Sequence, residues 1–181
     1  MDTISASPEV LARARKIKLL ISDVDGVLTD GHIYMGAQGE AFKAFNILDG
    51  FGIKALQDAG ITFAVITGRE SAIVTQRMRE LSVRYVFQGQ GNKMSAFNTL
   101  RTQLRLSDEQ IAHVGDDLPD LPLIRRAGLG VAVANAYPTL KQHAHYITRA
   151  FGGQGAMREI SDLILTGHGL LDGVIGRYRD A

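Results

Sequence analysis

The chain has 181 residues, 45% of them hydrophobic and 22% charged, with a formal net charge of +1. This composition predicts one globular domain, residues 1–181, with a sizeable core. The near-neutral charge provides no broad field for nucleic acid or an anionic membrane, so we expect neither partner. The lack of cysteine excludes disulfides, thiolate metal sites and cysteine nucleophiles. We expect a cytoplasmic protein, because no segment resembles a signal peptide or a membrane span.

Apolar segments of strand length alternate along the chain with segments of helical periodicity. The predicted strands are 17–24, 61–67, 85–88, 111–115, 130–134 and 146–148. The predicted helices are 50–58, 71–81, 93–104, 118–127 and 138–143. This alternation predicts an α/β fold, a doubly wound and mostly parallel Rossmann-like sheet with helices on both faces.

Two segments depart from this alternation. Residues 31–46 offer two short runs around Gly36-Ala37-Gln38-Gly39, which predicts a β-hairpin inserted after the first strand. The hairpin would overhang a site at the end of that strand, although a plain surface hairpin is an equal alternative. After Leu165 we expect a break and a short helical tail over about residues 166–181.

Acidic residues gather where predicted strands end. Asp23 and Asp25 follow the first strand, and Asp116 and Asp117 follow the fourth. The carboxyl ends of parallel strands meet at one edge of a doubly wound sheet, where ligands bind. Four carboxylates there would repel one another unless a cation neutralised them, and oxygen-only ligands favour Mg²⁺. The alternative is that these residues are helix caps and turn aspartates.

Four short motifs carry a resemblance to a known family. They are Asp23-Val24-Asp25-Gly26-Val27-Leu28-Thr29, Thr67-Gly68-Arg69, Lys93, and Gly115-Asp116-Asp117-Leu118-Pro119-Asp120. In order and spacing they resemble the motifs of the haloacid dehalogenase-like phosphatases. The set is highly specific, whereas Thr-Gly-Arg alone would mean little.

The resemblance implies a catalytic role for four residues. Asp23 would attack phosphorus and form an aspartyl-phosphate. Asp25 would protonate the departing sugar oxygen and then accept a proton from the attacking water. Thr67 and the amides after it would hold phosphate oxygens, and Lys93 would stabilise the charge that develops during transfer.

The resemblance also implies a metal-binding set. The ligands would be the Asp23 carboxylate, the Asp25 main-chain carbonyl and the Asp116 carboxylate, with Asp117 in or near the surrounding shell. The five histidines show no metal-ligand spacing tied to these residues, and His113 is expected to be a hydrogen-bonded interior residue.

The spacing of the motifs leaves no room for a cap domain. The hairpin and one helix fill the first gap, and a helix and a short strand fill the second. Such a site must serve a large substrate or borrow a lid from another subunit. Residues 30–46 and 152–159 resemble segments of the 3-deoxy-D-manno-octulosonate 8-phosphate phosphatase family, whose members are homotetramers with packed hairpins and a C-terminal segment that reaches the neighbouring site. A helix entry loop is the alternative for the glycine-rich run before Ala156.

This second resemblance implies a phosphorylated sugar acid as substrate and a place in lipopolysaccharide precursor synthesis. The positions that match substrate contacts are Asp25, Asn46, Asp49, Gly50, Lys54, Thr67, Gly68, Arg69, Arg77 and Lys93. Leu48 departs from the pattern, because several relatives carry arginine there, so a nonulosonate 9-phosphate remains an alternative. A non-catalytic oligomerisation module and a receiver-like phospho-acceptor domain are two alternatives from other functional classes.

Overall fold

The computed structural model of the chain describes residues 6–179. A six-stranded parallel sheet forms its centre, in the order β5-β4-β1-β6-β7-β8. The strands are β1 (Leu19–Ser22), β4 (Thr62–Ile66), β5 (Tyr85–Phe87), β6 (Ile111–Gly115), β7 (Leu129–Ala132) and β8 (Tyr146–Ile147). Because β4 and β6 lie on opposite sides of β1, the chain reverses its winding direction at β1.

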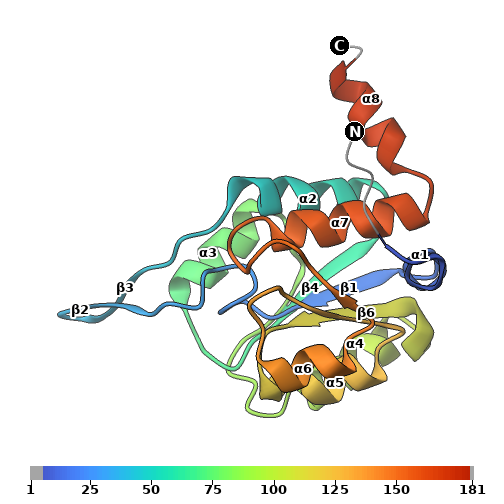
Figure 1. Cartoon of the computed structure of the whole chain (residues 1–181). Coiled ribbons are helices and arrows are strands. Elements are labelled where there is room, and N and C mark those ends of the chain that lie inside the picture. The colour runs from blue at the N-terminus through green and yellow to red at the C-terminus, as the bar shows by residue number, and fades with distance from the viewer. Residues whose placement is uncertain (1–5, 180–181) are drawn as a thin grey trace.

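Helices cover both faces of the sheet (Figure 1). One face carries α2 (Ile47–Asp58), α3 (Ala72–Glu80) and α7 (Ala156–Gly167), and the other carries α4 (Lys93–Gln103), α5 (Leu121–Arg126) and α6 (Pro138–His143). Side-chain alternation along β1 supplies both cores, since Leu19 and Ile21 pack with Phe97 on one face and Leu20 joins the larger core on the other.

Smaller elements complete the described chain. Helix α1 (Pro8–Ala14) precedes the sheet, and one-turn 3₁₀ helices span Asp108–Gln110 and Leu118–Asp120. Helix α8 (Leu171–Arg179) follows α7 and turns away from the body of the molecule (Figure 1). No helix within residues 6–179 is long and apolar enough to cross a membrane.

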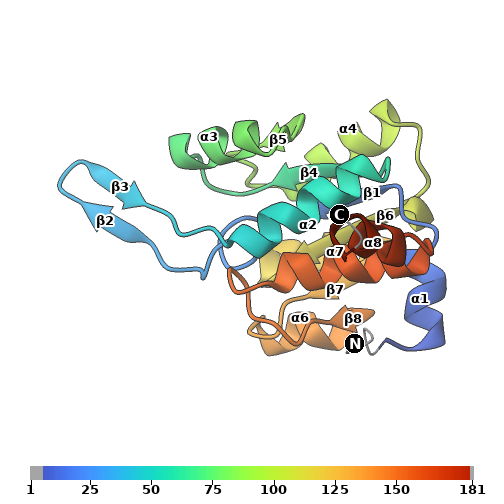
Figure 2. The ribbon, with the colours of Figure 1, turned by 90° about the horizontal axis from the view of Figure 1, so that it is seen from above.

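The hairpin of β2 (Tyr34–Gly36) and β3 (Gly39–Phe42) extends well beyond the sheet and its helices (Figures 1 and 2). The rings of Tyr34 and Phe42 stack across it with centroids 4.4 Å apart. Met35 is 67% exposed and Phe42 is 55% exposed. A two-stranded ribbon of this kind is marginally stable alone, so these side chains need further cover.

The predicted fold class is confirmed, including the parallel sheet, the helices on both faces and the hairpin after the first strand; within residues 6–179, no cap domain interrupts the sheet. The prediction was wrong for residues 118–127, which form a 3₁₀ turn followed by α5. Pro122 has no N–H, so it cannot continue the helical hydrogen bonds from that turn. Helices α1 and α7 were not predicted. Helix α2 begins before its predicted start because Asn46 accepts a hydrogen bond from the Leu48 N–H at 2.8 Å.

Candidate active site

A pocket of about 310 Å³ lies at the carboxyl ends of the central strands. Asp23 directly follows β1, Thr67 directly follows β4 and Asp116 directly follows β6. This edge is the switch point of the sheet, where doubly wound folds bind their ligands. The pocket brings together these residues of the four predicted motifs: Asp23, Asp25, Thr67, Gly68, Arg69, Lys93, Asp116, Asp117, Pro119 and Asp120.

The loop after β1 is held in one conformation by short-range contacts. The Thr29 hydroxyl accepts hydrogen bonds from the Gly26 and Gly31 N–H groups at 3.3 Å and donates to the Val24 carbonyl at 3.4 Å. Gly26 has a φ of +84°, and a Cβ there would lie 2.1 Å from Asp116 Oδ2. Only glycine therefore lets this loop approach the carboxylate that follows β6.

Lys93 connects two buried carboxylates on the floor of the pocket. It is the first residue of α4, and its Nζ lies 2.8 Å from Asp23 Oδ2 and 2.8 Å from Asp120 Oδ1. His113 Nε2, from β6, lies 2.8 Å from the same Asp120 oxygen. Asp120 reaches this position because Gly115 leaves room for it, since a Cβ at Gly115 would lie 2.3 Å from Asp120 Cβ. A chain of contacts thus runs from His113 to the predicted nucleophile.

Burial and charge set the ionisation of this chain. Burial, together with the Asp120 charge, raises the pKa of Asp23 despite the favourable contact with Lys93. Burial alone would lower the pKa of Lys93, but the Asp120 and Asp23 carboxylates outweigh that effect and raise it. Lys93 therefore stays cationic and places a fixed positive charge against the Asp23 carboxylate.

The carboxylates also form a set that fits a divalent cation. Oxygens of Asp23, Asp116 and Asp120 lie within 4.8 Å of one another. Burial and the Asp23 and Asp120 charges raise the pKa of Asp116 to about 7. Within the described residues, Asp120 Oδ2 is buried and has no hydrogen-bond partner. A hard cation would relieve this repulsion, and an all-oxygen donor set is the kind that Mg²⁺ accepts.

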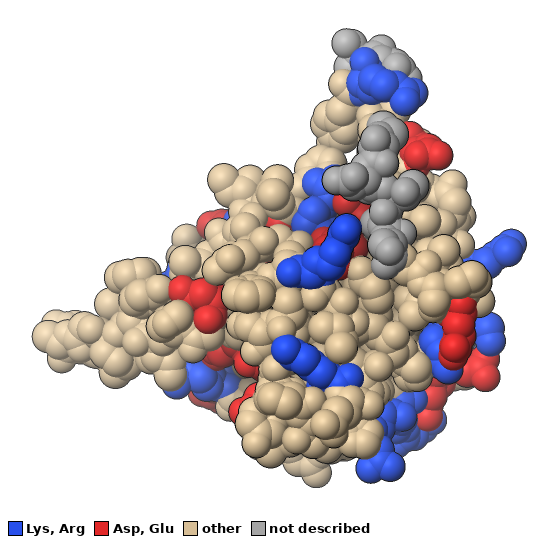
Figure 3. Space-filling model, in the orientation of Figure 1, with Lys and Arg blue, Asp and Glu red and all other residues tan. Residues whose placement is uncertain are grey.

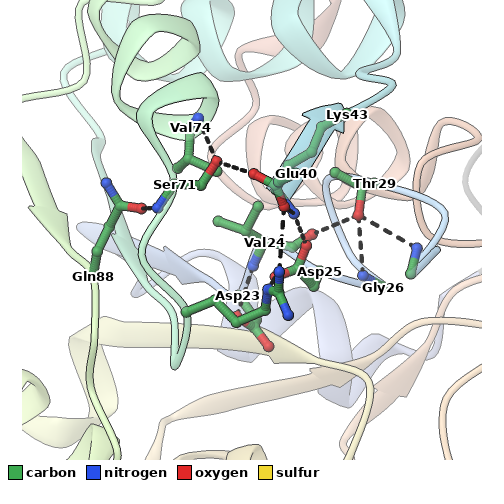
Figure 4. A network of polar contacts seen from close by, with 12 residues as sticks. Asp23, Val24, Asp25, Gly26, Thr29, Glu40, Lys43, Ser71, Val74 and Gln88 are labelled. Carbon is green, nitrogen blue, oxygen red and sulfur yellow. Dashed lines mark hydrogen bonds and ion pairs between the residues drawn. The ribbon is translucent and has the colours of Figure 1, made fainter. Parts of the chain in front are cut away.

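The Asp25 carboxylate lies beside Glu40 and Lys43 of the hairpin (Figure 4). Lys43 Nζ contacts its Oδ1, and Arg69 Nε lies 3.6 Å from its Oδ2. The Asp25 carboxylate therefore lies between two cations at the mouth of the pocket. Asp117 also lines the pocket, where its exposed carboxylate accepts a hydrogen bond from the Leu118 N–H at 2.7 Å.

The other predicted substrate contacts lie around α2 and α3, outside the described lining of this pocket. Asn46 caps α2, and buried Asp49 accepts a hydrogen bond at 2.8 Å from the Arg158 N–H in the first turn of α7. Gly50 lies against Arg77, which also stacks over Phe45 and pairs with Glu80 at 3.3 Å. Lys54 is exposed on α2. A separate cavity of about 10 Å³ joins four of these positions, namely Asn46, Asp49, Gly50 and Arg77.

The glycine-rich run before α7 packs against the loop that carries the nucleophile. The Gly153 N–H donates to the Val27 carbonyl at 2.9 Å, and a Cβ at Gly152 would lie 1.7 Å from the Gly26 carbonyl oxygen. Gly155, with a φ of +101°, is the N-cap of α7. The run is therefore a helix entry loop within its own chain, as in the alternative interpretation of the sequence.

Four polar residues at the site were not identified as site residues from the sequence. Asp120 was quoted in its motif without a role, and His113 was expected in the interior. His113 is fully buried, but within the described chain only its Nε2 has a partner. Glu40 and Lys43 at the base of the hairpin meet Asp25 and Arg69. Charged residues flanking a hairpin are usually solvated, so their pattern carried no signal.

Comparison with known proteins agrees with this geometry. Residues 85–158 match the family of haloacid dehalogenase-like hydrolases. The chain is 48% identical over 171 residues to the 3-deoxy-D-manno-octulosonate 8-phosphate phosphatase KdsC of Escherichia coli K12. The aligned region covers 94% of this chain and 91% of that protein. A crystal structure of the phosphatase from Yersinia pestis is 47% identical, with a TM-score of 0.93 and coverage of 96% of this chain and 95% of that one.

A further solved relative carries ligands. The Moraxella catarrhalis 3-deoxy-D-manno-octulosonate 8-phosphate phosphatase, in complex with a magnesium ion, a phosphate ion and a KDO molecule, is 41% identical with a TM-score of 0.92. The match covers 94% of this chain and 98% of that one. With this identity over nearly its whole length, the chain belongs to the 3-deoxy-D-manno-octulosonate 8-phosphate phosphatase family of haloacid dehalogenase-like hydrolases.

Proposed function

We propose that this chain is a Mg²⁺-dependent phosphatase that hydrolyses 3-deoxy-D-manno-octulosonate 8-phosphate to the free sugar acid and inorganic phosphate. The carrying observation is the placement of Asp23 against Lys93 at 2.8 Å, beside Asp116, in the strand-end pocket. The near full-length similarity to phosphatases of that substrate supports the choice of sugar. A place in the cytoplasm and in lipopolysaccharide precursor synthesis follows as part of the proposal.

Asp23 is the proposed nucleophile. One of its oxygens forms a bond to phosphorus while the bond from phosphorus to the sugar oxygen breaks, and Asp25 gives its proton to that departing oxygen. Water then attacks the phosphorus of the aspartyl-phosphate and gives a proton to Asp25, while the bond from phosphorus to the Asp23 oxygen breaks; phosphate is released and the Asp23 carboxylate is restored. Both residues lie on one tight loop after β1 and line the same pocket, which supports their joint action on one phosphoryl group.

The other pocket residues position the phosphoryl group and balance its charge. Lys93 neutralises the Asp23 carboxylate before attack and the phosphoryl oxygens during transfer. Thr67 and the amides of Gly68 and Arg69 lie at the end of β4, where backbone donors are suited to phosphate. Mg²⁺, held by Asp23, Asp116 and the Asp25 carbonyl, would supply positive charge that offsets repulsion between carboxylates and phosphate.

A homotetramer is part of the proposal. The hairpin exposes Ile33, Met35 and Phe42, and its outer end carries no charged side chain on the face seen in Figure 3. An exposed apolar ribbon of this kind fits a second copy of itself better than solvent. Ile47, the first residue of α2 after the hairpin, is also 83% exposed.

The tail is proposed to complete a neighbour's pocket. Helix α7 begins beside the loop of Asp23 and runs about 18 Å away from it, at 1.5 Å for each of its 12 residues. Helix α8 starts at that far end and turns away from the body (Figures 1 and 2). It is thus directed away from its own pocket, whereas a neighbouring copy could receive it.

The contacts to the sugar acid remain proposals. Arg69 at the pocket mouth is placed to meet an anionic group, because its guanidinium side chain is 44% exposed. The small neighbouring cavity is lined by four of the other five predicted contacts, which supports a secondary role for them around α2. These are Asn46, Asp49, Gly50 and Arg77; Lys54 does not line it.

The deciding experiment measures phosphate release from a panel of substrates by the purified protein. We expect the octulosonate 8-phosphate to give the highest kcat/KM, followed by a nonulosonate 9-phosphate, with a neutral hexose phosphate far lower. EDTA should abolish turnover and Mg²⁺ should restore it.

Other results would redirect the proposal. A preference for the nonulosonate would move the substrate assignment to that alternative. No phosphate release from any substrate would indicate an oligomerisation module, and a long-lived phospho-Asp23 without turnover would indicate a receiver-like domain. Asp58→Asn is the matched control for the substitution Asp23→Asn. It changes an exposed aspartate at the end of α2 and should leave activity unchanged.

A further inference from the structure

Lys43 is a lysine of the hairpin whose charged end lies inside the molecule. It directly follows β3, yet its side chain is only 1% exposed. Its Nζ contacts Asp25 Oδ1 and lies 2.9 Å from Glu40 Oε1 (Figure 4). Burying a lysine costs free energy unless its charge is paired, and here two carboxylates pair with it.

Glu40 connects this lysine to the body of the protein. Its Oε1 also lies 3.4 Å from Arg69 Nη2, and its Oε2 accepts a hydrogen bond from the Ser71 hydroxyl. Ser71 is in turn the N-cap of α3, where its Oγ accepts a hydrogen bond from the Val74 N–H at 3.4 Å. The contacts therefore run from the N-terminus of α3, through Glu40 and Lys43, to Asp25 (Figure 4).

The charges in this network are stable. Burial alone would raise the pKa of Glu40, but hydrogen bonds from Ser71 and Lys43 outweigh it and lower that pKa. Burial would likewise lower the pKa of Lys43, but the hydrogen bonds to Asp25 and Glu40 raise it. The network thus holds Lys43 as a cation and Glu40 as an anion.

We propose that Lys43 is a positioning residue for the acid–base carboxylate, and that it fixes Asp25 Oδ1 so that Oδ2 faces the departing oxygen. Glu40 holds Lys43 in place, which makes the hairpin base part of the catalytic arrangement. This inference rests on the proposed phosphatase activity and on Asp25 as its acid.

The inference predicts which step suffers when Lys43 is changed. During the first displacement, Asp25 acts in its protonated form: the proton on Oδ2 passes to the oxygen that leaves phosphorus as the bond from Asp23 to phosphorus forms, while Oδ1 keeps its contact with Lys43. A poor leaving group requires that proton, whereas a nitrophenolate leaves without it. Loss of Asp25 positioning should therefore increase the dependence of the rate on the leaving group.

The test compares two aryl phosphates that differ in the leaving group and lack the sugar and its carboxylate. For Lys43→Met, we expect kcat/KM for phenyl phosphate to fall roughly tenfold or more, since misplacement by about 1 Å costs that much or more. We expect kcat/KM for p-nitrophenyl phosphate to change less than about twofold. This parameter reports the first displacement alone, so a slow second step does not obscure the comparison.

Two further variants separate positioning from loss of fold. Lys43→Arg keeps two donors for Asp25 and Glu40 and should recover most of the phenyl phosphate activity. Lys16→Met is the matched control, because Lys16 pairs with Glu109 in an exposed contact before the amino ends of β1 and β6, whereas the pocket lies at their carboxyl ends. Thermal unfolding of each variant checks the fold, and Glu40→Gln, which weakens the hold on Lys43, replaces Lys43→Met if that variant does not fold.

Several outcomes would overturn the inference. Equal losses on both aryl phosphates for Lys43→Met would indicate a general structural role, and no loss on either would indicate a passive contact. In both cases the wild-type protein would still hydrolyse the sugar phosphate, so the proposed function would stand. Absence of wild-type turnover on every substrate would instead remove the proposed function itself.

Discussion

The side chains of the pocket have polar partners within the protomer, whereas the apolar side chains of the hairpin are largely exposed. In the pocket, Lys93 joins Asp23 to Asp120, and His113 reaches Asp120 from a separate strand. At the hairpin tip, Met35 and Phe42 are mostly exposed and stack or pack only locally. Residues of the same protomer thus supply the polar partners of the pocket side chains. Within residues 6–179, the apolar side chains of the hairpin have no comparable packing partners.

The difference teaches that catalytic geometry and enclosure have separate origins in this fold. The sheet fixes Asp23, Thr67 and Asp116 because each directly follows one of three adjacent strands, β1, β4 and β6. In the proposed tetramer, enclosure would depend on segments outside the sheet, namely the hairpin and the tail. Substitutions in the two regions should therefore affect different measurements.

The largest effect is expected in the pocket. Asp23→Asn should lower kcat by at least about 10⁴-fold, because it removes the nucleophile. Burial raises the pKa of Asp23, so at neutral pH ionisation of this carboxyl group costs the folded protein free energy relative to the unfolded chain. The neutral amide removes this penalty, so Tm in EDTA at neutral pH should hold or rise. Phosphate release and thermal unfolding check both parts, and normal activity would refute the mechanism.

A smaller effect is expected at His113, which is connected to Asp23 only through Asp120 and Lys93. His113→Phe removes the Nε2 contact to Asp120 and should destabilise the protein by about 1–3 kcal/mol. It should also lower kcat more than it raises KM. Without His113, Asp120 is less constrained, so it holds Lys93 less firmly against Asp23.

His113→Gln is the matched variant, since its amide N–H can reach the same oxygen. Urea unfolding and steady-state kinetics compare the two substitutions. If the phenylalanine and glutamine variants behave identically, the contact with Asp120 has no influence on catalysis and the histidine is only a core residue.

The smallest effect on the pocket should come from the hairpin tip. Met35→Lys should leave the free energy of unfolding of the protomer within about 0.5 kcal/mol, because Met35 is 67% exposed. It should nevertheless dissociate the proposed tetramer, since like charges would meet where the hairpins are proposed to pack. Light scattering coupled to gel filtration measures the mass. Ile147→Lys, at a 44% exposed site on β8, is the control, and an unchanged mass for Met35→Lys would place the interface elsewhere.

Sequence patterns predicted what depends on neighbouring residues in the chain. Alternation of apolar segments predicted the sheet, and the position of Asp23, Thr67 and Asp116 after strands predicted that they would meet. Helix α7 was not predicted, because its N-terminus is capped by Asp49, 109 residues before Arg158 in the chain. A cap supplied from such a distance leaves no local signature.

The pairing of Asp120 shows the same limit within the site. Its contact with Lys93, 27 residues earlier, exists because Gly115 lets the chain turn back under β6. Lys43 is similar, since its burial depends on Asp25, 18 residues away. Local spacing predicts which side chains reach the sheet edge, but partners from other elements decide their orientation.

The close approach of Gly152 to Gly26 has a consequence for synthesis of the protein on the ribosome. All residues proposed to take part in the chemistry precede residue 121, so a nascent chain holds them well before translation ends. The Asp23 loop nevertheless gains its contact with Gly153 only after residues beyond 150 have emerged. An incomplete chain would therefore carry every catalytic group while its nucleophile loop lacked this support, and activity would arise only near the end of translation.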